Sequence, residues 1–212
     1  MIPHHRRALV IVIDDYKKTR TLGQQEGSVI PKFPQLPEVQ QDKLTVVSGL
    51  KKTMGFFEFE ITVLENPDFL GISQEFAKIR AFVREKRDKG ETVLLYVYFA
   101  GHGIIEEQTK AVVNTDNPKR WAFPIEQNIR ILGAIKGCFV FAVLDCCREM
   151  IKAAIAASIA PKPKPAEGVA NSRGIGAANA SDPEEWNCCA INFGCKAGCT
   201  VAGASTIAMT YF

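Results

Sequence analysis

Short apolar runs alternate with segments of helical periodicity along the chain of 212 residues. Four runs predict strands, and they are Ala8–Ile13, Phe57–Leu64, Val93–Ala100 and Cys138–Leu144. The first, third and fourth are nearly continuous in large apolar residues, as expected for strands that are covered on both faces. The second alternates apolar and polar residues, which is typical of an edge strand. A fifth strand-like run, Cys188–Phe193, lies near the C-terminal end.

Helical patterns lie between these runs. Apolar residues three, four or seven positions apart predict three helices, marked by Val39, Val46, Val47 and Leu50, by Phe76, Ile79, Phe82 and Val83, and by Ile125, Ile129 and Leu132. The basic residues Lys17, Lys18 and Arg20 are expected to form a solvated turn. Strands that alternate with helices of this length predict an α/β fold with a parallel sheet and right-handed crossovers.

The character of the chain changes after the fourth run. Residues 149–160 are compatible with an alanine-rich helix, and the following residues are rich in proline, alanine, glycine and serine, which is typical of a mobile linker. We therefore divide a single domain into a first part (1–157), a linker (158–187) and a last part (188–212). The last part ends within a helix-like pattern, so a truncation at the C-terminus is expected.

Composition narrows the class of protein. Hydrophobic residues make up 47% and charged residues 23%, which is ordinary for a globular domain. A net charge of +3 does not argue for a nucleic-acid partner. No apolar run is long enough for a transmembrane helix, and no signal peptide is expected. Seven cysteines in a chain without a secretion signal are expected to be free thiols in the cytoplasm.

One histidine and one pair of cysteines stand where chemistry is expected. His4 and His5 lie in the N-terminal tail, which leaves His102, between two glycines after the third run, while Cys146 and Cys147 follow the fourth run. Functional residues gather at the carboxyl ends of parallel strands, so neighbouring strands would bring the imidazole to a thiol. An imidazole favours the thiolate and can protonate a leaving amine. Backbone N–H groups of Gly103 and of the nucleophile are the expected oxyanion donors.

These segments carry a resemblance to a known family. YVYFAGHG and VLDCCRE resemble the two catalytic signatures of the caspase-like cysteine peptidases, in particular the paracaspase and metacaspase branch. A third match, from Leu36 to Asp42 with Leu50 and Gly55-Phe56 after it, resembles the first helix of the family. The resemblance implies a three-layer fold with helices on both faces of a mostly parallel sheet. It also implies that Cys147, two residues after an aspartate, is the nucleophile.

The resemblance further implies a preference for basic side chains. In the family, the counterparts of Asp145 and Asp42 line the pocket for the residue before the cleaved bond, so cleavage after arginine, or lysine, is expected. Two other interpretations stay open: Asp145 as the cap of a following helix and Asp42 as an acid in a first helical turn. Self-cleavage is expected in the linker, for example at Lys164 or Arg173.

No cofactor is expected. The metacaspase activator is calcium, but the region after the third run offers only Glu106, Glu107 and Asp116, so we expect a calcium-independent enzyme. The C-terminal cysteines lack the C-x2-C pairs of zinc modules, so no metal site is expected.

The sequence therefore predicts a cytoplasmic cysteine endopeptidase that binds its protein substrate as an extended strand. A homodimer, the form that caspase relatives often take, stays open. The alternative is a catalytically silent caspase-like scaffold that acts through protein contacts. A thiol redox protein that uses Cys146 and Cys147 ranks last, because neighbouring cysteines bridge only with strain.

Overall fold

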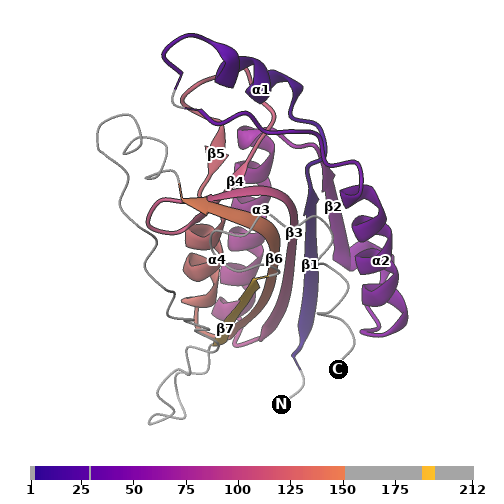
Figure 1. The fold of residues 1–212 in the computed structure, drawn as a ribbon. Helices are drawn as coiled ribbons and strands as arrows, with labels where there is room; N and C mark the ends of the chain where they lie inside the picture. The colour runs from indigo at the N-terminus through magenta and orange to yellow at the C-terminus, as the bar shows by residue number, and fades with distance from the viewer. Residues whose placement is uncertain (1–2, 29, 151–187, 194–212) are drawn as a thin grey trace, which may run out of the picture.

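The computed structural model describes residues 3–28, 30–150 and 188–193, with the backbone alone for residues 147–150, 188 and 193. Seven strands form one sheet (Figure 1): β1 His5–Val12, β2 Ile61–Glu65, β3 Val93–Ile105, β4 Thr109–Val112, β5 Ala122–Phe123, β6 Cys138–Met150 and β7 Cys188–Phe193. The helices of the described residues are α1 Lys17–Gln24, α2 Val39–Lys52, α3 Phe69–Asp88, α4 Ile125–Gly133 and the short 3-10 helix η1 Glu58–Glu60.

The centre of the sheet is parallel. β1 pairs in parallel with β2 on one side and β3 on the other, and β3, β6 and β7 continue the sheet in parallel. β4 pairs with β3, and β5 with β4, in the antiparallel sense. The mostly parallel α/β sheet predicted from the sequence is confirmed, and β2, which pairs with β1 alone among the described strands, is an edge strand as predicted.

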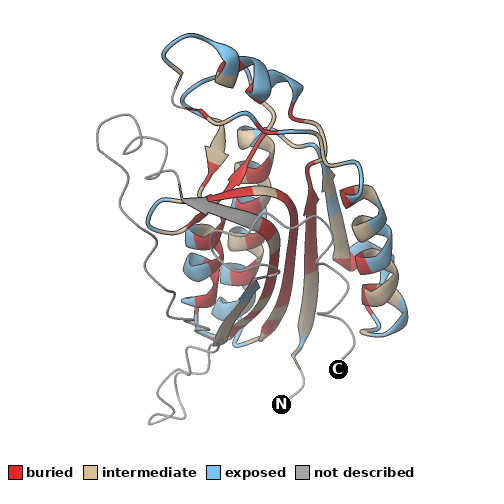
Figure 2. Ribbon diagram, in the orientation of Figure 1, coloured by how far each residue is buried: buried red, intermediate tan, exposed pale blue. Residues whose placement is uncertain are grey.

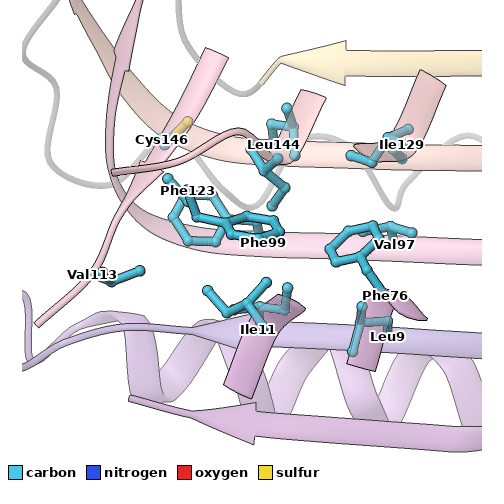
Figure 3. Packing of buried hydrophobic residues seen from close by; sticks show 14 of the residues in the cluster. Leu9, Ile11, Phe76, Val97, Phe99, Val113, Phe123, Ile129, Leu144 and Cys146 are labelled. Carbon is cyan, nitrogen blue, oxygen red and sulfur yellow. The ribbon is translucent and has the colours of Figure 1, made fainter. Parts of the chain in front are cut away.

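Two hydrophobic clusters cover opposite faces of the sheet. Alternate residues of each central strand face opposite sides, so Leu9 and Val97 contribute to one cluster and Val10 and Tyr98 to the other. The first cluster packs against α3 and α4 and the second against α2. Buried residues follow the central strands in Figure 2, and Figure 3 shows the first cluster from close by. Helices thus cover both faces, as the caspase-like fold requires.

Several predicted boundaries were wrong for physical reasons. The expected strand Phe57–Leu64 begins only at Ile61, because the Glu60 carboxylate accepts a hydrogen bond from the Phe57 N–H at 2.8 Å and closes the turn of η1. Phe57 and Phe59 are consequently 60% and 76% exposed, and their alternation with Glu58 does not mark a strand. β3 and β6 run past their predicted ends to Ile105 and Met150, since the two strands stay paired over that length.

The segment that was expected to be a basic turn is helix α1. Asp15 Oδ1 accepts a hydrogen bond from the Lys17 N–H at 3.0 Å as the helix begins. The Thr19 hydroxyl is buried and donates to the Val113 carbonyl, and Leu22 packs into the core, so tertiary contacts hold the helix. Its exposed face carries Lys17, Lys18 and Arg20, in keeping with the solvation that the sequence predicted.

Among the described residues, no helix combines the length and the apolar character that a membrane span requires. The predicted linker and the end of the chain lie outside the described residues, and the three-part division of the domain stays a prediction.

Candidate active site

The pairing of β3 with β6 brings the two candidate catalytic segments side by side. In the parallel register, Ala100 lies opposite Asp145, Gly101 opposite Cys146, His102 opposite Cys147 and Gly103 opposite Arg148. The sequence expected both segments just beyond the strand ends, but they lie inside the C-terminal parts of β3 and β6. Adjacent strands lie about 5 Å apart, so the backbones of His102 and Cys147 are immediate neighbours.

The imidazole of His102 is held on two sides. Its Nε2 lies 3.0 Å from the carbonyl oxygen of Pro34. Because a carbonyl only accepts, Nε2 donates in this bond, and in the neutral ring Nδ1 is then the basic nitrogen. The ring packs edge-on against Tyr16, with centroids 4.7 Å apart, and at a tilt against Phe33, at 5.2 Å. These contacts fix both the tautomer and the orientation of the imidazole.

The backbone of His102 is held separately. Its N–H donates to the hydroxyl oxygen of Tyr16 at 2.8 Å. Tyr16 is fully buried, and burial raises the pKa of its hydroxyl far above the ordinary range of a tyrosine. The hydroxyl is therefore neutral near neutral pH.

Two carboxylates act on the second aromatic hydroxyl of the site, that of Tyr98. The Tyr98 hydroxyl donates to Asp145 Oδ2 at 3.2 Å. Burial raises the pKa of Tyr98, and the negative charges of Asp145 and then of Asp42 raise it further. The two carboxylates therefore act on the same hydroxyl from different elements, because Asp145 belongs to β6 and Asp42 to the first turn of α2.

The structure decides one of the alternatives for these aspartates. Asp145 lies within a strand, so its interpretation as the cap of a following helix was wrong. Asp42 does lie in the first turn of α2, where a carboxylate stabilises the helix dipole. That position is compatible with a pocket role as well, since the charge of Asp42 still reaches Tyr98.

Cys146 is part of the hydrophobic core, and the backbone of its neighbour Cys147 pairs with that of His102. Cys146 is 3% exposed and belongs to the first hydrophobic cluster, where Figure 3 shows it near Leu144. Cys138, at the start of β6, is also buried, which raises the pKa of its thiol to about 12. Both cysteines are core residues, as expected from the sequence. Cys147 is described by its backbone, which continues β6 next to His102.

Other predicted residues are placed less fully. Gly103 lies in β3, opposite Ala111 of β4 and Arg148 of β6. Lys164 and Arg173, the expected positions of self-cleavage, lie outside the described residues. Of the three carboxylates weighed for calcium, Glu106 forms an ion pair with Lys110. In the part of the chain that the structure describes, no three His, Cys, Asp or Glu side chains group so that they could hold a metal ion.

Sequence reasoning missed four residues of the site: Tyr16, Phe33, Pro34 and Tyr98. Phe33 and Pro34 lie in a loop without periodicity, so no local signal marked them. Tyr98 was assigned to the core, and its hydroxyl partner is visible only once β6 is placed beside β3. Tyr16 follows two aspartates in an apparent turn, and a large aromatic residue in such a turn was the one available sign.

Comparison with known families agrees with this geometry. The family model described as caspase domain, peptidase C14, matches residues 5–204. The chain belongs to the caspase-domain family of cysteine peptidases. The match covers β1 to β7 together with both candidate catalytic segments. A comparison with curated proteins found no match for the chain.

Proposed function

We propose that this caspase-domain protein is a cysteine endopeptidase that cleaves after basic residues, arginine before lysine, through Cys147 and His102. The register that sets His102 opposite Cys147 on adjacent parallel strands supports this proposal most strongly. Burial of Cys146 in the core favours Cys147 as the nucleophile. The position of Cys147 two residues after Asp145 agrees with the family pattern that the sequence resembles.

The proposed reaction has two steps. Nδ1 of His102 takes the thiol proton, and the Cys147 thiolate forms a bond to the scissile carbonyl carbon. The imidazolium then returns the proton to the leaving amine as the peptide bond breaks, and water later hydrolyses the thioester. The Pro34 carbonyl, which accepts from Nε2 at 3.0 Å, stabilises the charged ring between these transfers. The N–H groups of Gly103 and Cys147 are the proposed donors to the oxyanion.

Asp145 and Asp42 are the proposed specificity residues. Their combined effect on the Tyr98 hydroxyl supports a common location for the two carboxylates. A guanidinium binds a carboxylate with two parallel hydrogen bonds, whereas an acidic substrate side chain would be repelled by the same groups. The proposal therefore includes cleavage after arginine and no cleavage after aspartate, which is the residue that caspases in the strict sense prefer.

The test uses the full chain and fluorogenic peptides that end in Arg, Lys or Asp, with and without calcium. Cys147→Ala is the control for the nucleophile, and Asp145→Asn removes one charge from the pocket while it keeps the shape. We expect cleavage after Arg without calcium, no cleavage by Cys147→Ala, and a larger loss for Arg peptides than for neutral ones in Asp145→Asn. Cleavage only after Asp would overturn the specificity, and no cleavage of any peptide would favour the scaffold alternative.

Three further expectations belong to this proposal. The substrate binds as an extended strand beside the pocket, where backbone hydrogen bonds supply affinity independent of sequence. Lys164 and Arg173 of the linker are cut by the enzyme itself, so Cys147→Ala should keep its full mass while the wild-type protein is shortened. The protein works in the cytoplasm, where its thiols stay reduced.

A further inference from the structure

A break in strand pairing lies next to His102. β1 pairs with β3 as far as Ala100, whose carbonyl accepts from the Ile13 N–H at 3.0 Å. β4 begins to pair with β3 only at Gly103. Because β6 occupies the other edge of β3 along its whole length, β1 and β4 share one edge. Among the described strands, none pairs with Gly101 and His102 along that edge.

The side chain of Tyr16 fills this break. In a regular parallel ladder, the N–H two residues beyond Ala100 would donate to the carbonyl of Ile13. Here the His102 N–H donates to the Tyr16 hydroxyl oxygen at 2.8 Å. Tyr16 is fully buried, so this donor has a partner where water does not reach easily. The side chain thus continues the ladder at the residue that carries the imidazole.

The residue before His102 is fitted to the same hydroxyl. Gly101 has a φ of +153°, a conformation that L residues rarely adopt. A Cβ atom at this position would lie 2.5 Å from the Tyr16 hydroxyl oxygen and 3.2 Å from the Ile13 carbonyl oxygen. Close approach of the tyrosine therefore requires glycine here, which gives a physical reason for the first glycine of the Gly-His-Gly segment.

We propose that the Tyr16 hydroxyl is a positioning residue for the catalytic step, acting through the main chain of His102. The hydrogen bond from the His102 N–H to this hydroxyl fixes the position of the His102 backbone, and therefore the alignment of the imidazole with Cys147 on β6. The inference rests on the proposed Cys147–His102 dyad. Loss of the hydroxyl leaves a partly buried N–H without its acceptor, and the segment shifts to find another partner. Misplacement of a reacting group by about 1 Å can lower a rate about 100-fold.

The hydroxyl can be removed without removing the ring. Tyr16→Phe keeps the contact with the imidazole at 4.7 Å between centroids and removes only the acceptor. Tyr96→Phe is the matched control, because Tyr96 is a buried tyrosine of β3 that packs in the other cluster, away from Tyr16. The ionisable side chains that influence Tyr16 are those of Cys146 and Asp14, and both are unchanged in each variant.

The readout is the pH dependence of alkylation of Cys147 by iodoacetamide, in which the thiolate forms a bond to carbon and iodide leaves. Tandem mass spectrometry assigns the modified cysteine, so no substrate is needed. We expect alkylation of Cys147 in the wild-type protein at about pH 6, where a thiol without an imidazole partner is mostly protonated. Tyr16→Phe should slow it about tenfold at that pH and leave the rate unchanged above about pH 9, where the thiol ionises without help.

The outcomes separate the inference from the proposed function. If His102→Ala alkylates Cys147 as fast as the wild-type protein at about pH 6, no dyad exists, and both the proposed function and the inference fail. If His102→Ala is slow and Tyr16→Phe equals the wild-type protein, the dyad stands and the positioning role of Tyr16 is wrong. A loss in Tyr16→Phe that Tyr96→Phe reproduces is a general effect on stability and also overturns the inference. All rates are compared well below each variant's melting temperature.

Discussion

Replacing Gly101 with alanine should destabilise the protein and disturb the site together. The new Cβ atom would lie 2.5 Å from the Tyr16 hydroxyl oxygen and 3.1 Å from Cζ of Phe99, both of which are fully buried. Overpacking in a core costs about 1–3 kcal/mol. The φ of +153° adds about 1–3 kcal/mol for an L residue. Gly101→Ala should therefore lower the free energy of unfolding by about 2–6 kcal/mol.

Urea unfolding followed by circular dichroism measures this loss, and Gly27→Ala provides the matched control. Gly27 has a φ of +73° and no neighbouring atom within 4 Å of the added Cβ, so its variant carries a cost of positive φ without any clash. A second arm adds Tyr16→Phe to Gly101→Ala, which removes the clashing oxygen. The double variant should lose less stability than the sum of the two single losses. The reasoning is refuted if Gly101→Ala loses no more than Gly27→Ala, or if the two losses at Gly101 and Tyr16 simply add.

Two other predictions concern ionisable groups away from the dyad. Burial tends to raise the pKa of Glu126, but hydrogen bonds from the Thr109 N–H at 2.9 Å and from Arg130 outweigh it and lower the pKa. Glu126→Gln should lower the free energy of unfolding by about 1–2 kcal/mol near neutral pH. Because the lowered pKa stabilises the folded state only while Glu126 is ionised, the difference in free energy of unfolding from the wild-type protein should disappear as the pH falls below about 4, as urea titrations can measure. A difference that widens in acid would contradict this sign. Burial raises the pKa of the Cys138 thiol to about 12, so iodoacetamide at about pH 8 should modify Cys138 in unfolded but not in folded protein, as mass spectrometry can check.

The sequence predicted the parts of the fold that depend on local burial. Ala8–Ile13 and Val93–Ala100 are covered on both faces, and their unbroken apolar runs reflect this directly. The run Cys188–Phe193 was placed with the bounds that β7 has. Where a strand continues through residues of low strand propensity, prediction failed: Gly101 and Gly103 indicate a turn by themselves, yet β3 passes through both because β6 pairs with it.

Some residues of the candidate site could likewise be predicted from the sequence, and others could not. His102 and Cys147 could be chosen from the sequence, because chemistry restricts the residue types and a parallel sheet brings its strand ends together. The partners that orient the histidine could not be chosen from the sequence, since Pro34 and Tyr16 are 68 and 86 positions away in the chain. Pro34 reaches His102 because of the path of its loop, and Tyr16 because β1 and β4 leave a gap in the pairing along β3. Asp42 could be predicted only in part. Its place in a helical turn was predictable, whereas its effect on the pKa of Tyr98 depends on how α2 packs on the sheet.

In the proposed reaction, Cys147, activated by His102, attacks the carbonyl that follows a basic side chain. Peptidyl acyloxymethyl ketones with arginine or aspartate at the reactive end test it directly, because an attacking thiolate displaces the carboxylate and leaves a thioether that mass spectrometry can locate. We expect one adduct, on Cys147, formed by the arginine reagent much faster than by the aspartate reagent and lost in His102→Ala. An adduct on another cysteine, or a faster reaction with the aspartate reagent, would contradict it.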